Sequence, residues 1–301
     1  CKTVLSNEDS QGGKCDRCGN DVIQVDRDVW FLKMKEYSEK LLKNIDNIQM
    51  ADNLKEAQRN WIGKSEGVEL SMPVVDENGV ELSQVKIFTT CIETAYGITY
   101  VVLAPEHSMV DSLKDKIENM DEVLKYKEKT ALKSEFDRIS QVKDKSGCKL
   151  CGLYAINPLN NKKVPLYLGD YVLGNYGTGA VMAVPAHDQR DYEFAKEHNI
   201  EIVQVIDGDI SNQAVEKLEY ISKNSKMLNS DKFSGLSVID DKKQITDLIV
   251  KNGFGRVQIN YKMQDWPFNR QRYWGEPFPV VFCDKCGIVP LDEKDLPLLL
   301  P

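Results

Sequence analysis

The chain has 301 residues, of which 42% are apolar and 29% are charged. These values are typical of a soluble globular protein, and the length allows more than one domain. The 39 basic and 47 acidic side chains give a net charge of -8. This charge argues against a broad surface that coats nucleic acid, but it permits contact with one RNA end. The apolar stretch over residues 98–105 is too short to cross a bilayer, and the first residues do not resemble a signal peptide.

The pattern of apolar residues and turns predicts a mixed α/β fold. Residues 1–25 are rich in turns. The elements expected after them are helices over 26–47 and 52–60, strands over 68–73, 80–90 and 98–103, helices over 108–129 and 130–139, and strands over 150–156 and 164–172. The rest should form a helix over 186–199, a strand over 200–206, helices around 213–218 and over 239–251, a strand over 255–259, and a ribbon beginning near 266. We expect three parts, 1–66, 67–256 and 257–301, in which two arms flank one central domain.

Residues 177–191 have a pattern that suits a binding site. A glycine-flanked turn leads into an apolar run over 180–184, and Pro185 is tolerated in a first helical turn. Asp188 and Asp191 follow at i, i+3 spacing, so they share one face beside backbone N–H groups that need acceptors. Such a pocket is suited to an ammonium group. The alternative is that both carboxylates are solvated capping charges.

Two cysteine pairs near the chain ends are almost copies of each other. Cys15 and Cys18, like Cys283 and Cys286, form a Cys-x-x-Cys-Gly motif. Four thiolates from two such motifs suit one closed tetrahedral zinc site, which would tie the chain ends together. The alternative is four free cysteines on unrelated loops. The eight cysteines of the chain favour metal binding or free thiols in a reducing compartment, and therefore a cytoplasmic protein.

Two further motifs have weaker signals. Cys148 and Cys151 lack a matching second pair, which favours two residues packed in a sheet. Residues 88–97 carry several threonines and one carboxylate on a strand-to-turn segment. Threonine hydroxyls can hold a water or donate to a developing oxyanion, although threonine is also common in strands.

Taken together, these motifs resemble the connective-peptide insertion of bacterial leucyl-tRNA synthetases over almost the whole chain. Residues 60–67 are similar to the entry ribbon of that insertion, and residues 88–97 to its threonine-rich region. Residues 99–107 resemble its continuation, residues 176–194 the segment with its editing aspartate, and residues 269–275 its exit motif. The two cysteine pairs resemble the zinc module of some bacterial members. The resemblance implies a β-barrel-like editing domain of class I aminoacyl-tRNA synthetases, flanked by a small zinc ribbon and helical or β-ribbon arms.

The resemblance implies post-transfer editing, in which the ester of mischarged tRNA(Leu) is hydrolysed. The wrong amino acids would be of the isoleucine, methionine and norvaline type. In the catalytic group, Asp191 would hold the substrate ammonium, while Thr89 and Thr90 would position water and stabilise the transition state. Thr94 would exclude leucine by steric contact. The other substrate-binding residues would be Tyr176, Met182, Asp188 and Glu93. The zinc would be structural, held by Cys15, Cys18, Cys283 and Cys286, and the editing reaction would need no cofactor.

The synthetic motifs of such an enzyme do not occur in these residues: there is neither a His-x-Gly-His box nor a Lys-Met-Ser-Lys-Ser loop. We therefore expect no ATP-dependent activation of leucine, with ATP binding left to the parent enzyme. The expected partners are the tRNA(Leu) 3′ end and the rest of a synthetase chain, with the fragment itself a monomer and no membrane involved. Cys91 replaces the arginine usual in the family, and Ile92-Glu93 replaces Pro-Asp, which puts the contact with the RNA end in doubt.

Two other interpretations remain open at this stage. The editing insertion of valyl-tRNA synthetases shares the ancestral fold, although residues 99–107 and 270–275 favour leucine. A zinc-ribbon module that binds RNA without catalysis is the alternative from another class. His187, next to Asp188, is interpreted as a cap or packing residue rather than a general base.

Overall fold

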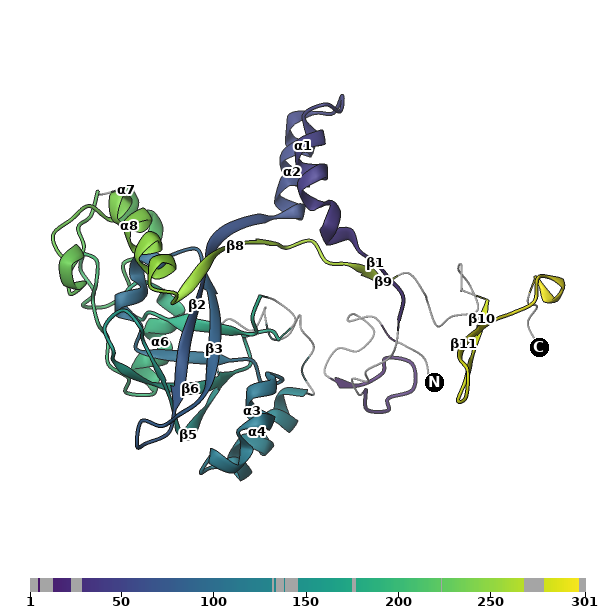
Figure 1. The fold of residues 1–301 in the computed structure, drawn as a ribbon, viewed down its shortest axis with the longest axis horizontal. Coiled ribbons are helices and arrows are strands. Elements are labelled where there is room, and N and C mark those ends of the chain that lie inside the picture. Colours follow the sequence, from purple (N-terminus) through teal and green to yellow (C-terminus); the bar gives the residue numbers. More distant parts are fainter. Residues whose placement is uncertain are drawn as a thin grey trace. The chain divides into compact units, whose positions relative to one another are not determined.

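The computed structural model of the chain describes residues 5, 13–22, 29–131, 133, 138, 146–174, 177–222, 224–267 and 279–297. The chain divides into two compact units (Figure 1). The sheet unit comprises Ser65–Asn260, and the terminal unit combines Cys1–Lys64 with Tyr261–Pro301.

The sheet unit is built on one mixed sheet. Its strands are β2 (Lys64–Val75), β3 (Glu81–Thr89), β4 (Tyr100–Leu103), β5 (Gly147–Ile156), β6 (Lys163–Gly169), β7 (Ala180–Ala183) and β8 (Gly255–Tyr261). They lie in the order β3-β2-β5-β6-β4-β7, and β8 also pairs with β2. β4 and β6 are parallel, whereas β4 and β7 are antiparallel.

The sequence pattern explains which strands are central. In β2, Val68, Leu70, Met72 and Val74 are buried while the residues between them are partly exposed, as expected for a strand with one face on the core. All four residues of β4 are buried, because β4 lies between β6 and β7 with both faces covered. The end strands β3 and β7 contact each other. In the described part of the chain the sheet therefore curls like a barrel, but hydrogen bonds do not close it.

Short helices surround this sheet. They are η3 (Ile92–Gly97), α3 (Ser108–Ser112), η4 (Lys114–Lys116), α4 (Met120–Ala131), α6 (Gln189–Glu197), α7 (Lys217–Ser222), η5 (Asp231–Phe233) and α8 (Val238–Lys251). Helix α8 buries Ile245 and Ile249 in the main core and packs against η3. The mixed α/β fold class predicted from the sequence is confirmed.

The described part of the terminal unit contains two α-helices, two short 3-10 helices and two small ribbons. Its elements are β1 (Phe31–Leu32), η2 (Met34–Tyr37), α1 (Ser38–Ile45), α2 (Asp52–Ile62), β9 (Trp266–Pro267), β10 (Val280–Cys283), β11 (Gly287–Pro290) and η6 (Glu293–Asp295). Its small core joins Ile45 and Ile62 to Met263. Gly63 ends α2 in a left-handed conformation with φ +58, where a Cβ would also lie 2.7 Å from the Lys262 side chain.

Several expected elements differ from the observed ones. The helix predicted over 26–47 begins only at Ser38, and residues 31–32 form a strand instead. The helix predicted over 186–199 begins at Gln189, because Asp188 is its N-cap and residues 185–187 form a turn. Residues 200–206 make only an isolated bridge, from Ile206 to Met227, so the strand prediction is wrong there.

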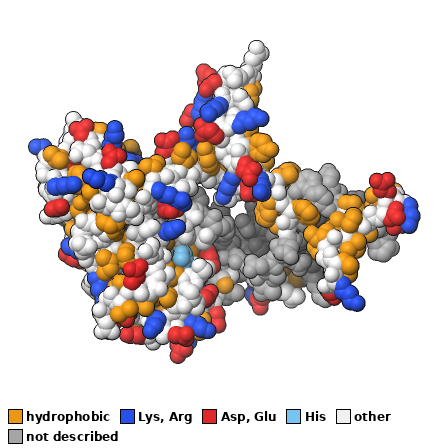
Figure 2. All heavy atoms as spheres, viewed as in Figure 1, with side chains coloured by type: hydrophobic (Ala, Val, Ile, Leu, Met, Phe, Trp, Pro, Cys, Tyr) orange, Lys and Arg blue, Asp and Glu red, His pale blue; other side chains and the backbone are white. Residues whose placement is uncertain are grey.

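The surface agrees with the modest net charge. On the face shown in Figure 2, basic and acidic side chains are intermingled over the described residues of the sheet unit. Among the helices of the described residues, none combines the length and the apolar character needed to cross a membrane.

Candidate functional site

The two aspartates at the start of α6 have different environments. Asp188 is the N-cap: its Oδ1 accepts hydrogen bonds from the backbone N–H groups of Arg190 at 2.9 Å and Asp191 at 3.2 Å. Its Oδ2 lies 3.3 Å from the Arg190 guanidinium. Asp191 is only 9% exposed, and its Oδ2 accepts from the backbone N–H of Val184 at 2.8 Å. The capping interpretation therefore describes Asp188, whereas Asp191 is a buried carboxylate.

The aromatic side chain of Tyr100 holds the backbone of Asp191 in place. The Tyr100 hydroxyl donates to the Asp191 carbonyl at 3.3 Å, and the Tyr100 ring stacks on Phe194 with centroids 5.2 Å apart. Burial, together with the nearby Asp191 charge, raises the pKa of Tyr100 well above its ordinary value. The phenol therefore stays protonated and can donate, so the first turn of α6 is held in one position.

His187 is a packing residue. It is 7% exposed, its Nδ1 lies 3.1 Å from the Val215 carbonyl, and its Nε2 accepts from the N–H groups of Val205 and Ile206, each at 3.1 Å. Burial lowers the pKa of His187 to about 4, so the ring is neutral at pH 7. Because the backbone occupies both ring nitrogens, His187 is not available as a general base.

The threonine-rich segment folds into a compact loop between β3 and β4. The N–H of Cys91 donates to Oγ1 of Thr89 at 3.0 Å, and the Thr94 hydroxyl donates to the Cys91 carbonyl at 2.9 Å. Thr89 and Thr94 are buried, and Thr90 is partly exposed. The hydroxyl of Thr94 is thus bonded within its own loop.

Glu93 lies inside the protein, 2% exposed. The Tyr220 hydroxyl on α7 donates to Glu93 Oε1 at 3.0 Å, and the Lys242 ammonium on α8 lies 3.7 Å from Oε2. Glu93 is among the substrate-binding residues expected from the sequence, whereas its carboxylate in the structure has protein partners. Tyr220 and Lys242 were missed because nothing in the sequence connects them with the loop.

The threonine loop and the Asp191 segment are neighbours through shared contacts. The N–H of Thr99 donates to the Ala183 carbonyl at 3.2 Å. A Cβ on Gly97 would lie 3.1 Å from the Val184 side chain, so the end of the loop packs against the residue whose N–H binds Asp191. Both segments therefore lie at the same end of the pair β4 and β7.

Of the two remaining predicted substrate-binding residues, one can be placed. Met182 is half-buried on β7, opposite Val101, and packs against the main core. Tyr176 lies outside the described residues.

The two cysteine pairs occupy similar turns in the terminal unit. The Cys15 carbonyl accepts from the Gly19 N–H at 2.9 Å, and Gly19 has φ +69. Cys283 pairs with Gly287, which has φ +73, across the turn between β10 and β11. A hydrogen bond from the Asn20 backbone lowers the pKa of Cys18, and one from the Lys285 backbone lowers that of Cys283. Within the described ranges, no three His, Cys, Asp or Glu side chains lie close enough together to hold a metal.

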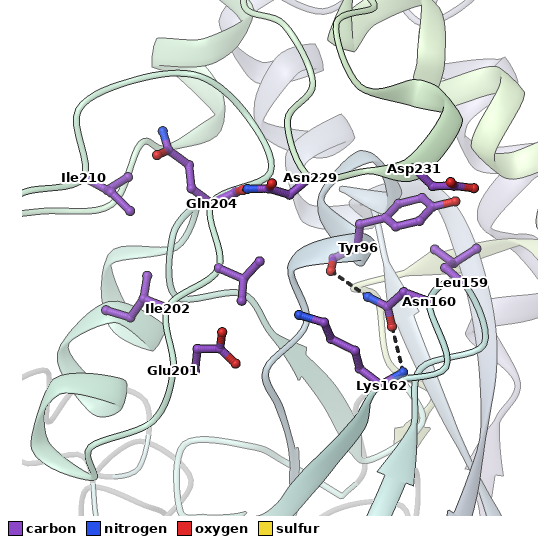
Figure 3. A pocket seen from close by; sticks show the side chains of 11 residues that line it. Tyr96, Leu159, Asn160, Lys162, Glu201, Ile202, Gln204, Ile210, Asn229 and Asp231 are labelled. Carbon is purple, nitrogen blue, oxygen red and sulfur yellow. Dashed lines mark hydrogen bonds between the residues drawn. The ribbon is translucent and has the colours of Figure 1, made fainter.

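The sheet unit also has a cavity of about 720 Å³, which Tyr96 of the threonine-rich segment helps to line (Figure 3). Its lining consists of Tyr96, Leu159, Asn160, Lys162, Glu201, Ile202, Val203, Gln204, Ile210, Asn229 and Asp231. The Asn160 amide binds the Tyr96 carbonyl at 3.1 Å and the Lys162 N–H at 3.0 Å, and Asn229 binds the Gln204 carbonyl at 2.8 Å. These amide hydrogen bonds connect the segments that line the cavity. None of the predicted catalytic residues lines it. Its size alone does not make it the functional site.

The comparisons with known proteins agree on one family. A family model described as "Leucyl-tRNA synthetase, editing domain" matches residues 59–250. Two relatives named leucine--tRNA ligase, from Alkaliphilus oremlandii and Clostridium kluyveri, are 43% and 45% identical. Each alignment covers 100% of this chain and 36% of the relative. The chain thus spans about a third of the length of these relatives.

A solved structure shares the fold. It is the ternary LeuRS–tRNA–LeuAMS complex of Agrobacterium radiobacter K84 agnB2, similar with a TM-score of 0.73 at 30% identity, over 100% of this chain and 33% of that one. The shared fold and the family match thus define an editing domain of the aminoacyl-tRNA synthetase class. Within this class, the chain belongs to the leucyl-tRNA synthetase family, as a segment that contains its editing domain. This finding favours the leucyl over the valyl alternative.

Proposed function

We propose that the sheet unit hydrolyses the aminoacyl ester of mischarged tRNA(Leu), with isoleucine, methionine or norvaline type residues as the amino acids removed. The observation that carries this proposal is the buried Asp191 carboxylate, held beside the threonine loop within the region that matches the editing-domain family. A carboxylate in a partly enclosed position binds an ammonium by a charge-assisted hydrogen bond. It would therefore distinguish an aminoacyl ester from a plain ester.

In the proposed mechanism, the threonine hydroxyls act at the ester carbonyl. Water attacks the carbonyl carbon, the carbonyl oxygen becomes an oxyanion, and the ribose oxygen leaves with a proton. Thr89 and Thr90 orient the water and donate to the oxyanion, so catalysis comes from positioning and charge stabilisation. The neutral, fully bonded His187 takes no part as a base.

Selectivity and RNA binding complete the proposal. The Thr94 methyl group excludes the leucine side chain, while Met182 and Tyr176 line the pocket for the terminal adenosine and Asp188 supports Asp191. The partners are the 3′ end of tRNA(Leu) and the remainder of a synthetase chain, in the cytoplasm. The tRNA in the similar LeuRS complex supports this choice of partner.

We also propose a structural zinc ion held by Cys15, Cys18, Cys283 and Cys286. Each pair suits half of a tetrahedral thiolate site, because each lies in a turn that ends at a glycine with positive φ. Metal analysis of the purified chain should find one zinc, which Cys283→Ala removes. Cys151→Ala, at a half-buried cysteine of β5, should keep it. Equal zinc content in both variants would rule out this ligand set.

The editing proposal is tested by deacylation of Ile-tRNA(Leu) and Thr-tRNA(Val). The chain is assayed alone, and also built into the Clostridium kluyveri ligase in place of the matching segment. We expect hydrolysis of Ile-tRNA(Leu) and little of Thr-tRNA(Val). Hydrolysis of Thr-tRNA(Val) alone would support the valyl alternative, and RNA binding without any hydrolysis would support a non-catalytic module.

A further inference from the structure

An ionic cluster around a buried carboxylate adjoins the threonine loop, and the proposed mechanism does not use it. Its members are Glu93 on η3, Tyr220 on α7 and Lys242 on α8. The Lys242 side chain is 40% exposed, whereas that of Glu93 is 2% exposed. Tyr220 is 1% exposed, and burial followed by the Glu93 charge raises its pKa, so its hydroxyl stays protonated and donates to Glu93. The cluster therefore joins three elements at one carboxylate.

Lys242 makes two contacts with the loop. Its ammonium lies 3.7 Å from Glu93 Oε2, and it also donates a hydrogen bond to the backbone carbonyl of Thr90. Glu93 Oε2 has no hydrogen-bond donor in the described part of the chain, so Lys242 neutralises its charge at ion-pair distance. One side chain thus contacts both ends of residues 90–93.

Helix α8, which carries Lys242, is fixed to the hydrophobic core. Helix α8 buries Ile245 and Ile249 in the core one and two turns after Lys242. The Thr246 hydroxyl also donates to the Lys242 carbonyl at 2.8 Å. The Thr90 carbonyl is therefore linked through Lys242 to a helix whose own position is set by the hydrophobic core.

We propose that Lys242 is a positioning residue for the threonine loop, and that it acts through its bond to Thr90 as well as through the charge of Glu93. The inference rests on the proposed function, because the loop is taken to hold the reacting water and oxyanion. A misplacement of about 1 Å in such a site costs about 10²-fold in rate. Lys242 contacts neither substrate nor reacting atoms in this proposal.

The two roles of Lys242 are separable by substitution. Lys242→Met removes both contacts and leaves the Glu93 carboxylate buried without its cation, which destabilises the fold. Glu93→Gln removes the charge but keeps an oxygen for the Tyr220 hydroxyl. The double variant Lys242→Met/Glu93→Gln has no uncompensated charge, yet it still lacks the bond to Thr90. Lys243→Met, at an exposed neighbour on α8, is the matched control.

The readouts are the thermal midpoint, kcat and KM for Ile-tRNA(Leu) hydrolysis, and amide hydrogen exchange over residues 89–97. We expect the double variant to regain the thermal midpoint of Glu93→Gln. Its kcat should stay about 10- to 100-fold below that of Glu93→Gln, and its KM should differ from that of Glu93→Gln by less than about twofold. Lys242→Arg should restore most of kcat, since a guanidinium can donate to the same carbonyl.

Two results would overturn the inference. If the double variant matches Glu93→Gln in kcat, Lys242 is only a counter-ion for Glu93. If KM rises while kcat is unchanged, Lys242 contacts the RNA instead.

Should the wild-type chain hydrolyse nothing in either form, the proposed function has failed, but hydrogen exchange still tests the positioning. Exchange over residues 89–97 must then be faster in the double variant than in Lys243→Met, and equal exchange would refute the role.

Discussion

Two buried carboxylates, Asp191 and Glu93, are held in opposite ways. Asp191 accepts from the N–H of Val184, seven residues before it, so neighbouring backbone fixes its position. Glu93 is held by the side chains of Tyr220, which is 127 residues away, and of Lys242. Both are buried, but Asp191 keeps the larger exposed fraction, 9% against 2% for Glu93.

The difference in partners indicates that the two carboxylates have different roles. A carboxylate bound by backbone groups keeps its place when a side chain nearby changes, which suits a group that must present its charge to a ligand. A carboxylate bound by distant side chains instead connects the elements that carry them, and it fails when one of them is lost. We therefore expect substitutions at Asp191 to affect chemistry more than folding, and substitutions around Glu93 to affect both.

The largest effect is expected from Asp191→Asn. The amide retains an oxygen for the Val184 N–H, but it cannot form a charge-assisted bond with the substrate ammonium. Hydrolysis of Ile-tRNA(Leu) should fall by about 10²- to 10³-fold, comparable to the loss of one transition-state contact, while the thermal midpoint changes little.

Asp247→Asn is the matched control for this loss. It neutralises an exposed carboxylate on α8 and should leave the rate unchanged. An Asp191→Asn variant as active as this control would mean that Asp191 is a structural acid like Glu93, and the contrast between the two would disappear.

The next effect concerns pH and involves His187, which packs against Tyr220, the hydrogen-bond partner of Glu93. His187 precedes Asp188, and its ring meets the Tyr220 ring edge-on at 6.2 Å. Burial lowers its pKa from 6.5 to about 4, so the unfolded chain binds more protons between these values. Stability should be complete above pH 6.5 and decline as pH falls toward 4, by about 2 kcal/mol between pH 7 and pH 5.

Urea unfolding at both pH values measures this decline. His187→Gln lacks the ring and its bonds to the backbone, so its free energy of unfolding should be lower at pH 7. Because it has no titrating group at this position, that free energy should also vary less with pH. An identical pH slope in the wild type and the variant would show that other groups control acid sensitivity.

How far the sequence predicts this site depends on the distance over which each contact acts. The location of Asp191 at the start of a helix could be predicted, because glycine, proline and aspartate spacing are local signals. The start of α6 was missed by three residues, since Asp188 is a better N-cap than the residues before Pro185. The contacts of Glu93 with α7 and α8 were not predictable, because only tertiary packing brings these elements to the loop.

A smaller change is expected from Thr94→Ala. In the proposed mechanism Thr94 excludes leucine by steric contact, so truncation of this side chain should make room for the leucine side chain. One methyl group corresponds to about 1–3 kcal/mol of discrimination, so hydrolysis of correctly charged Leu-tRNA(Leu) should rise about tenfold or more.

Thr130→Ala provides the comparison for this gain. Thr130 is also buried, and its hydroxyl also donates to a backbone carbonyl at 2.9 Å, but it lies on α4. It should not affect selectivity. An equal gain in both variants would point to general loosening of the sheet unit rather than to a steric role of Thr94.

The smallest effect is expected at Asp188, and it separates capping from charge. Asp188→Ala removes the acceptor for the N–H groups of Arg190 and Asp191 and should cost about 1 kcal/mol in the free energy of unfolding. Asp188→Asn keeps the acceptor oxygen and should recover most of this stability. If both variants instead lose hydrolysis as strongly as Asp191→Asn, the charge of Asp188 itself meets the substrate, and the two aspartates act as a pair. A stability loss in Asp188→Ala alone would leave Asp191 as the single carboxylate of the helix start that serves the ligand.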